Sequence, residues 1–164
     1  MAAAPASVVV EPAVPLDRAA VVALFVQDLV DLRMDHDEDA LGAVYDALLE
    51  GPRSLVLVAR QTPQGEAVGV LVATHVPSVK FQGWSLWIEE LFVDRTARHG
   101  GLGRAMVEHL LQIARGEGLK GIDLEAYHGN APAGLLYRSL GFRRLGRERF
   151  FYRFEWEQDQ EGEP

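Results

Sequence analysis

The segment Arg98-His99-Gly100-Gly101-Leu102-Gly103 is the glycine-rich part of this 164-residue sequence. An apolar stretch, Ile88–Val93, precedes it and an amphipathic stretch, Gly101–Gly116, follows, which predicts a strand, a turn and a helix. Glycines at a helix N-terminus let backbone N–H groups approach an anion, and the helix dipole also favours negative charge there. Arg95 and Arg104 flank the segment in a chain of net charge −8. We therefore interpret it as a phosphate-binding loop rather than a simple turn.

Two common phosphate-binding patterns do not fit this loop. The dinucleotide fingerprint G-x-G-x-x-G requires a small residue at its third position, where this chain has Met106. That fingerprint also opens a βαβ unit, whereas Gly101 follows several predicted antiparallel strands. The phosphate loop of nucleoside triphosphatases requires Gly-Lys-Ser/Thr, which the sequence lacks. We therefore expect neither a dinucleotide nor a nucleoside triphosphate at this position.

Two adjacent carboxylates, Glu89 and Glu90, stand within the apolar stretch Ile88–Val93. Neighbouring residues of a strand point to opposite faces, so at least one of these side chains is expected to face inward. A β-bulge could turn both toward solvent, which is the structural alternative. A bulge is equally the condition under which both carboxylates could serve one site, as a base and as an anchor for a cation.

Composition narrows the class of protein. The chain is 48% hydrophobic and 24% charged and has no cysteine, which excludes disulfides, thiolate metal sites and a cysteine nucleophile. Its net charge of −8 argues against general binding to nucleic acid or to anionic lipid. The five histidines show no metal-ligand spacing, so we expect no metal. With no secretion signal or apolar span in view, we expect a cytoplasmic protein that needs no membrane.

Hydrophobic periodicity predicts one domain over residues 7–156, with disordered tails at 1–6 and 157–164. The first predicted helix begins at Pro15 or Leu16 and carries an apolar face of Val22, Phe25, Val26, Leu29 and Leu32. A second helix follows Asp37 as its cap. The remaining predicted elements are the strands Ser7–Glu11, Ser54–Arg60, Ala67–Val76, Trp84–Val93 and Ile122–Ala126, the helices Gly101–Gly116 and Ala131–Leu140, and the strand-rich segment Phe142–Trp156 with a turn near Gly146. This order predicts an α/β fold with a mixed sheet and helices on both faces.

Acidic residues gather along the first two predicted helices and their connection. The run comprises Asp28, Asp31, Asp35, Asp37, Glu38, Asp39, Asp46 and Glu50, and only Arg33 opposes it. One interpretation is a solvated helix face, and the other is a surface that attracts a cationic substrate.

Several motifs together resemble one known family. Arg98-x-x-Gly101-x-Gly103 is similar to the Gln/Arg-x-x-Gly-x-Gly/Ala signature of the GNAT N-acetyltransferase superfamily. Asn130-x-Pro132-Ala133-x-x-Leu136-Tyr137-x-x-x-Gly141-Phe142 resembles its second cofactor motif, and Ile88–Val93 resembles its fourth strand. His99 and Gly100 depart from the pattern, since relatives usually carry Gly at the first position and often a basic residue at the second. The resemblance implies the GNAT acyl-CoA N-acyltransferase fold, with a mostly antiparallel sheet of six to seven strands.

The resemblance also implies acetyl-CoA as co-substrate. Its acetyl-pantetheine arm would lie between Leu91–Val93 and Leu124–Ala126, with the N–H of Leu91 or Phe92 toward the acetyl oxygen. Tyr137 matches the family's tyrosine acid, which protonates the leaving thiolate; its structural alternative is a packed helix aromatic. The implied cofactor-binding residues are Leu91, Phe92, Val93, Arg98, His99, Gly100, Gly101, Leu102, Gly103, Arg104, Asn130, Ala133 and Tyr137.

For the acceptor, the resemblance points to the diamine (spermidine/spermine) acetyltransferases, which carry an acidic pair matching Glu89 and Glu90. It implies Glu89 as the general base, acting through water, and Glu90 as a substrate anchor, with Asp28 and Asp35 in the acceptor wall. The implied reaction is direct acetyl transfer to a primary amine of a polyamine-like or aminoglycoside-like cation. The alternatives are a protein lysine or N-terminal acetyltransferase, and a non-catalytic acyl-CoA sensor or interaction module. Family members often form homodimers through their C-terminal strands, and we expect the same here.

Overall fold

The computed structural model describes residues 8–126, 130–146 and 153, which fall into two compact units, Met1–Ala131 and Pro132–Pro164. The described strands are β1 (Val9–Pro12), β2 (Ser54–Arg60), β3 (Gly69–Ser78), β4 (Gly83–Val93) and β5 (Ile122–Leu124). The helices are α1 (Arg18–Asp31), α2 (Glu38–Glu50), α3 (Leu102–Gly116) and α4 (Ala131–Ser139), with short 3₁₀ turns at Pro15–Asp17 and Arg95–Ala97.

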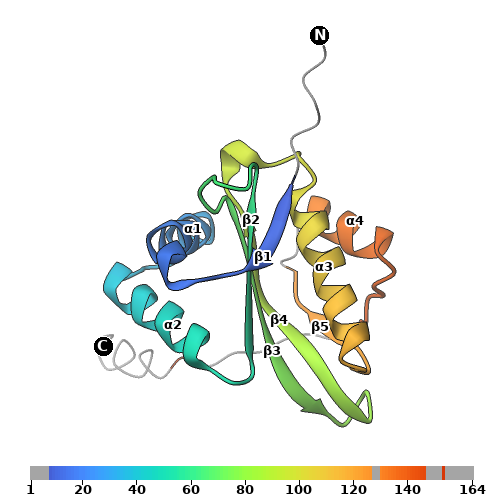
Figure 1. Ribbon diagram of the computed structural model, residues 1–164. Helices are drawn as coiled ribbons and strands as arrows, with labels where there is room; N and C mark the ends of the chain where they lie inside the picture. Colours follow the sequence, from blue (N-terminus) through green and yellow to red (C-terminus); the bar gives the residue numbers. More distant parts are fainter. Residues whose placement is uncertain (1–7, 127–129, 147–152, 154–164) are drawn as a thin grey trace, which may run out of the picture. The chain divides into compact units, whose positions relative to one another are not determined.

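The first unit is built on one sheet in the order β1-β2-β3-β4-β5. Neighbours from β1 to β4 run antiparallel, and β5 pairs with β4 in parallel. Helices α1 and α2 cover one face of this sheet and α3 covers the other (Figure 1). The mixed, mostly antiparallel sheet with helices on both faces confirms the predicted fold class.

The sheet has five strands within the described residues, fewer than the six to seven that we expected. Residues 142–146, which we assigned to a strand, contain none. Gly141 (φ +92°) precedes this segment in a conformation that an extended strand does not contain, and Gly146 (φ +59°) lies where we expected a turn. The rest of the strand-rich prediction lies outside the described residues, apart from Arg153, and so do both predicted tails.

Local signals explain where α1 and α2 begin. Asp37 caps α2 as predicted, because its Oδ1 accepts a hydrogen bond of 3.0 Å from the N–H of Ala40. Before α1, Asp17 is buried and accepts from Arg60 Nη2 at 2.7 Å. Its Oδ2 also accepts from the N–H of Val14 at 3.1 Å, so Pro15–Asp17 forms a separate 3₁₀ turn.

The phase of α1 differs from our prediction by about one residue. The helix buries Val21, Val22, Leu24 and Phe25, whereas Val26 and Leu29 are only half-buried. Together with Tyr45 of α2 and the facing strand residues, these side chains form the apolar cluster on one side of the sheet: Val21, Leu24, Phe25, Tyr45, Val56, Val58, Ala67, Val70, Val72 and Phe92. Because residues 21, 24 and 28 lie on one face of a helix, Asp28 extends this stripe toward β4.

Candidate active site

Strand β4 carries a β-bulge at the acidic pair. Val72 of β3 pairs with Glu90, and the next residue, Ala73, pairs with Ile88, so Glu89 falls between the two pairs. This is the irregularity that we set as the condition for a shared site. Val72 belongs to the apolar cluster under α1 and α2, and its partner Glu90 therefore lies on the same face of the sheet. Glu90 is half-buried there, and Glu89 is exposed.

On this face, Glu90 meets Asp28 from the end of α1, and the two carboxyl groups form a hydrogen bond. Two carboxyl groups can form one only if one of them holds a proton. Burial, followed by the charge of Asp28, raises the pKa of Glu90 to about 8. Burial raises the pKa of Asp28 as well, and the hydrogen bond to Glu90 offsets only part of that rise. The pair therefore shares one proton at neutral pH, and the pKa of about 8 assigns that proton to Glu90.

The ladder between β4 and β5 ends beside the bulge. Its parallel pairs are Leu86 with Ile122, Trp87 with Asp123 and Ile88 with Leu124, whereas β4 runs on to Val93. The strands thus stop pairing before Leu91–Val93, where we expected the acetyl-pantetheine arm. The N–H of Leu91, which we predicted to face the acetyl oxygen, donates to Glu90 Oε1 at 3.1 Å. That role of the N–H stays a prediction.

The glycine-rich segment forms the N-terminus of α3. Gly101 occupies the N-cap position with φ +79°, and it has no side chain to bond the first N–H groups of the helix. His99 has φ +66°, so two residues of this segment are left-handed. Residues 99–101 are exposed, whereas Leu102 is buried and anchors the first turn. An exposed helix N-terminus without a side-chain cap fits an anionic group.

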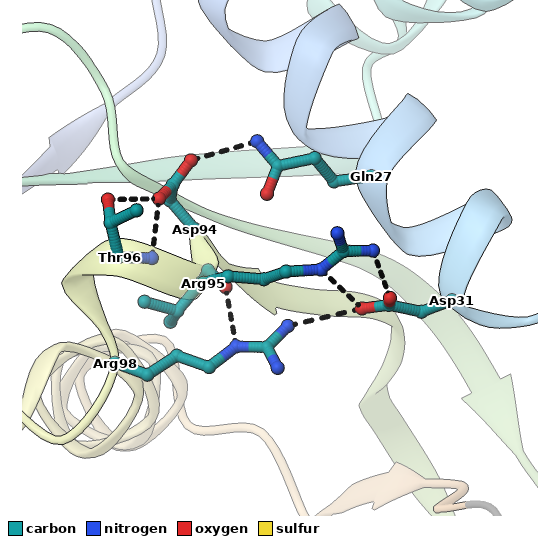
Figure 2. A network of polar contacts seen from close by, with 7 residues as sticks. Gln27, Asp31, Asp94, Arg95, Thr96 and Arg98 are labelled. Atoms are coloured by element: carbon teal, nitrogen blue, oxygen red, sulfur yellow. Dashed lines mark hydrogen bonds and ion pairs between the residues drawn. The ribbon is translucent and has the colours of Figure 1, made fainter.

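Two arginines near this loop, Arg95 and Arg98, form ion pairs with Asp31 of α1 (Figure 2). Arg98 Nε donates to the carbonyl oxygen of Val93 at 3.0 Å, and its Nη2 lies 3.4 Å from Asp31 Oδ2. Arg95 Nη2 forms a closer ion pair with Asp31 Oδ1. Hydrogen bonds from Arg95, and secondarily the charges of both arginines, lower the pKa of Asp31. Arg104, which we also predicted to bind cofactor, lies 3.2 Å from Glu108 one turn along α3.

A second contact of α1 holds the residue that follows β4. Gln27 Nε2 donates to Asp94 Oδ2 at 2.8 Å (Figure 2). The other oxygen of Asp94 accepts from the N–H of Thr96 at 2.8 Å and from its hydroxyl at 2.5 Å. Asp94 thereby caps the short 3₁₀ turn that leads from β4 to the loop.

In the second unit, α4 ends in a way that explains the spacing Tyr137-x-x-x-Gly141-Phe142. Gly141 is left-handed, its N–H donates to Arg138 O at 3.1 Å, and the N–H of Phe142 donates to Tyr137 O at 3.0 Å. This is the Schellman pattern of a helix C-terminus. The Tyr137 and Phe142 rings meet edge to face, with centroids 5.7 Å apart. The motif thus has a structural purpose, and the acid role of Tyr137 stays a prediction.

Comparison with known proteins shows which family this arrangement represents. Residues 19–142 match the family model described as the Acetyltransferase (GNAT) family. The chain belongs to this family. Similar curated proteins include N-acetyltransferase family 8 member 3 of Rattus norvegicus, 34% identical over 91 residues (56% of this chain and 39% of the relative). Streptothricin acetyltransferase of Streptomyces lavendulae is 34% identical over 77 residues, or 46% of this chain and 41% of the relative.

The ribosomal protein bS18-alanine N-acetyltransferase of Escherichia coli K12 is 40% identical over 60 residues, or 37% of this chain and 40% of that enzyme. The chain spans about two fifths of the length of these relatives. Among solved structures, a transcriptional regulator from Bacillus halodurans superposes with TM-score 0.77 at 23% identity, over 90% of this chain and 99% of that one. The aminoglycoside acetyltransferase meta-AAC0020 gives 0.71 at 18%, over 90% and 96%. Both likenesses confirm the predicted GNAT fold.

In this GNAT chain, the structure brings together only part of the predicted site. Asp28 and Glu90 meet, and Arg98 to Gly103 open α3 beyond the same strand. Asp35 is exposed, and so is Asn130, which directly precedes α4. Sequence reasoning missed the pairing of Asp31 with Arg95 and Arg98. The available signal was that Asp31 lies three residues after Asp28, which puts both acids on one face of the helix.

Other features of the described residues do not add to this site. A shallow cavity of about 310 Å³ lies between β1 and α3, lined by Val8, Val10, Ala105, Glu108, His109 and Gln112, and includes no predicted site residue. Within residues 8–126, 130–146 and 153, no three His, Asp or Glu side chains group as a metal site would require. No helix in that part of the chain combines the length and hydrophobicity needed to cross a bilayer.

Proposed function

We propose that this chain is an acetyl-CoA-dependent N-acetyltransferase that moves the acetyl group directly to a primary amine of a cationic small molecule. The observation that carries the proposal is the end of β4. There a bulge turns Glu90 toward Asp28, the ladder to β5 stops, and the chain continues into an uncapped, glycine-rich helix start. Family membership and the streptothricin and bS18-alanine acetyltransferases among its relatives support acetyl transfer as the chemistry.

The residues present fit the donor. Backbone N–H groups at the start of α3 would hold the pyrophosphate, aided by His99, Gly100 and the cations Arg98 and Arg104. Leu91, Phe92 and Val93 lie beyond the last β4–β5 pair and would contact the acetyl-pantetheine arm. Asn130, Ala133 and Tyr137 would contribute from the second cofactor motif. Acetyl-CoA itself supplies the activated acetyl group as a thioester.

The acceptor side rests on the two carboxyl groups. An amine with a pKa of about 10 must lose a proton before it can attack. At neutral pH the Asp28–Glu90 pair carries one negative charge, which attracts a cation, and a bound cation favours release of the proton that Glu90 holds. The pKa of Glu90, about 8, lies between the pKa of an ordinary carboxyl group and that of an amine. The geometry thus supports Glu90 as proton acceptor, with exposed Glu89 as the alternative acting through water.

The proposed step balances without any further reactant. The amine nitrogen forms an amide bond with the acetyl carbon while the thioester C–S bond breaks. When the cation binds, Glu90 releases its proton to solvent, and the ammonium then gives one proton to the carboxylate pair before it attacks. The nitrogen loses its second proton to solvent as the amide forms. The leaving thiolate receives a proton from Tyr137, which regains one from solvent. Exposed Asp35 would add to the acidic acceptor wall. We further propose a homodimer in the cytoplasm that binds neither nucleic acid nor membrane. The net charge of −8 supports the absence of nucleic-acid and membrane partners.

The test is a thiol-release assay with acetyl-CoA and a panel of acceptors. The panel contains a polyamine, an aminoglycoside, a lysine peptide and a peptide with N-terminal alanine. We expect release with the small cations, lost in Glu90→Gln. The bS18-alanine relative makes N-terminal acetylation the second candidate, and turnover of the alanine peptide alone would favour it. Binding of CoA without thiol release from any acceptor would show a sensor rather than an enzyme.

A further inference from the structure

Asp31 stands at the last residue of α1 and faces the arginines of the segment between β4 and α3. In the sequence it belongs to the acidic run that we assigned to the acceptor. In the structure its two oxygens are shared between Arg95 and Arg98 (Figure 2). The charge of Asp31 therefore pairs with arginines beside the proposed donor site. Asp28, one helical turn earlier, lies at the proposed acceptor site.

The segment that Asp31 holds leads directly into a loop with two left-handed residues, one of which is not glycine. His99 has φ +66° and Gly101 has φ +79°. A non-glycine residue in the left-handed region persists only where its surroundings hold it there. Arg98 is the immediate neighbour of His99, and it is held by Val93 O at 3.0 Å, by Asp31 at 3.4 Å and by the Phe92 ring, 5.1 Å from its guanidinium carbon.

We propose that Asp31 is a positioning residue for the phosphate-binding loop: through Arg95 and Arg98 it fixes the turn that presents the N-terminus of α3 to the donor's pyrophosphate. This inference rests on the proposed function. Asp31 does not touch the donor in this arrangement. It lowers the conformational freedom of the loop before binding, so less ordering remains to be done when the donor binds. Gln27, which holds Asp94 from the same helix, contributes to the same attachment.

The ion pairs are exposed enough for a clean test. The Asp31, Arg95 and Arg98 side chains are 35%, 50% and 41% exposed, so their removal is expected to affect global folding little. Asp46, which pairs with Arg18 at 2.9 Å with side chains 52% and 47% exposed, offers a matched control on the same helical layer. The variants are therefore Asp31→Asn, Asp31→Glu as the conservative replacement, and Asp46→Asn.

The first measurement is the Kd of CoA by calorimetry, which requires no acceptor. We expect Asp31→Asn to weaken CoA binding about tenfold, Asp31→Glu to retain most of the affinity, and Asp46→Asn to match the wild type. The second measurement compares acetyl-CoA with acetyl-pantetheine, which lacks the pyrophosphate. Asp31→Asn should raise KM for acetyl-CoA with little change in kcat, and leave KM for acetyl-pantetheine unchanged.

Three results would overturn the inference. They are an unchanged or lower Kd of CoA in Asp31→Asn, an equal loss with both donors, and an equal loss in Asp46→Asn. A wild-type chain that does not bind CoA at all would overturn the proposed function itself, and the inference with it. Tight CoA binding without acetyl transfer would contradict the proposed function and leave the CoA comparison to decide on Asp31.

Discussion

Replacing Glu90 with Gln removes a titrating group from the carboxyl pair while keeping the length and the polarity of the side chain. The pKa of Glu90 rises from an ordinary value of 4.5 to about 8 in the folded chain. Between these pH values the folded state holds a proton that the unfolded state has released. The contribution to stability is therefore complete below pH 4.5 and is lost as the pH rises through about 8.

The size of this effect follows from the shift. Each pH unit in that window lowers the free energy of unfolding by up to about 1.4 kcal/mol, so the whole shift corresponds to roughly 5 kcal/mol at most. Glu90 is only half-buried and water screens part of this, so we expect about 2–3 kcal/mol. Gln carries no such proton. Relative to the wild type, Glu90→Gln should therefore gain about 2–3 kcal/mol in unfolding free energy between pH 5 and pH 9.

The measurement is urea unfolding of both proteins at pH 5, 6, 7, 8 and 9. The quantity of interest is the difference in unfolding free energy at each pH, in which the contributions of titrating groups that do not interact with Glu90 cancel. Glu89→Gln is the control, because Glu89 is an exposed neighbour on the same strand. Parallel stability curves for Glu90→Gln and the wild type across this range would refute the assignment of the buried proton to Glu90.

Three further predictions concern the pair, the loop and the second cofactor motif. Asp28→Asn removes a charge and a hydrogen bond that raise the pKa of Glu90, so the acidic limb of the kcat/KM profile should move to lower pH; an unmoved limb would exclude their coupling. Gly101→Ala places a side chain at φ +79° and should lower the unfolding free energy by about 1–2 kcal/mol in thermal or urea melts, whereas His99→Gly should be neutral or stabilising. Tyr137→Phe keeps the ring that packs on Phe142 and should lower kcat about 100-fold or more; a kcat at the wild-type level would leave Tyr137 with its structural role only.

Much of the fold could be predicted because its signals are local. The bounds of β2 match the predicted Ser54–Arg60, Asp37 caps α2, and the glycine-rich segment opens α3. Each of these depends on residues a few positions apart, such as a capping carboxylate and the N–H groups that follow it. The acidic pair raised a β-bulge only as an alternative, since two adjacent charges on an apolar strand conflict with simple alternation.

The partners of the acids could not be predicted in this way. The sequence by itself determined that the chain has a phosphate-binding loop pattern, an acidic run and two adjacent glutamates. Only the tertiary structure decided that Asp28 meets Glu90 and that Asp31 meets Arg95 and Arg98. The reason is geometric: a shift of about one residue in the phase of α1 changes which of its acids face the sheet, and one inserted residue in β4 changes which glutamate they meet. Both depend on how the helix packs against the strand, which neighbouring residues in the sequence do not set.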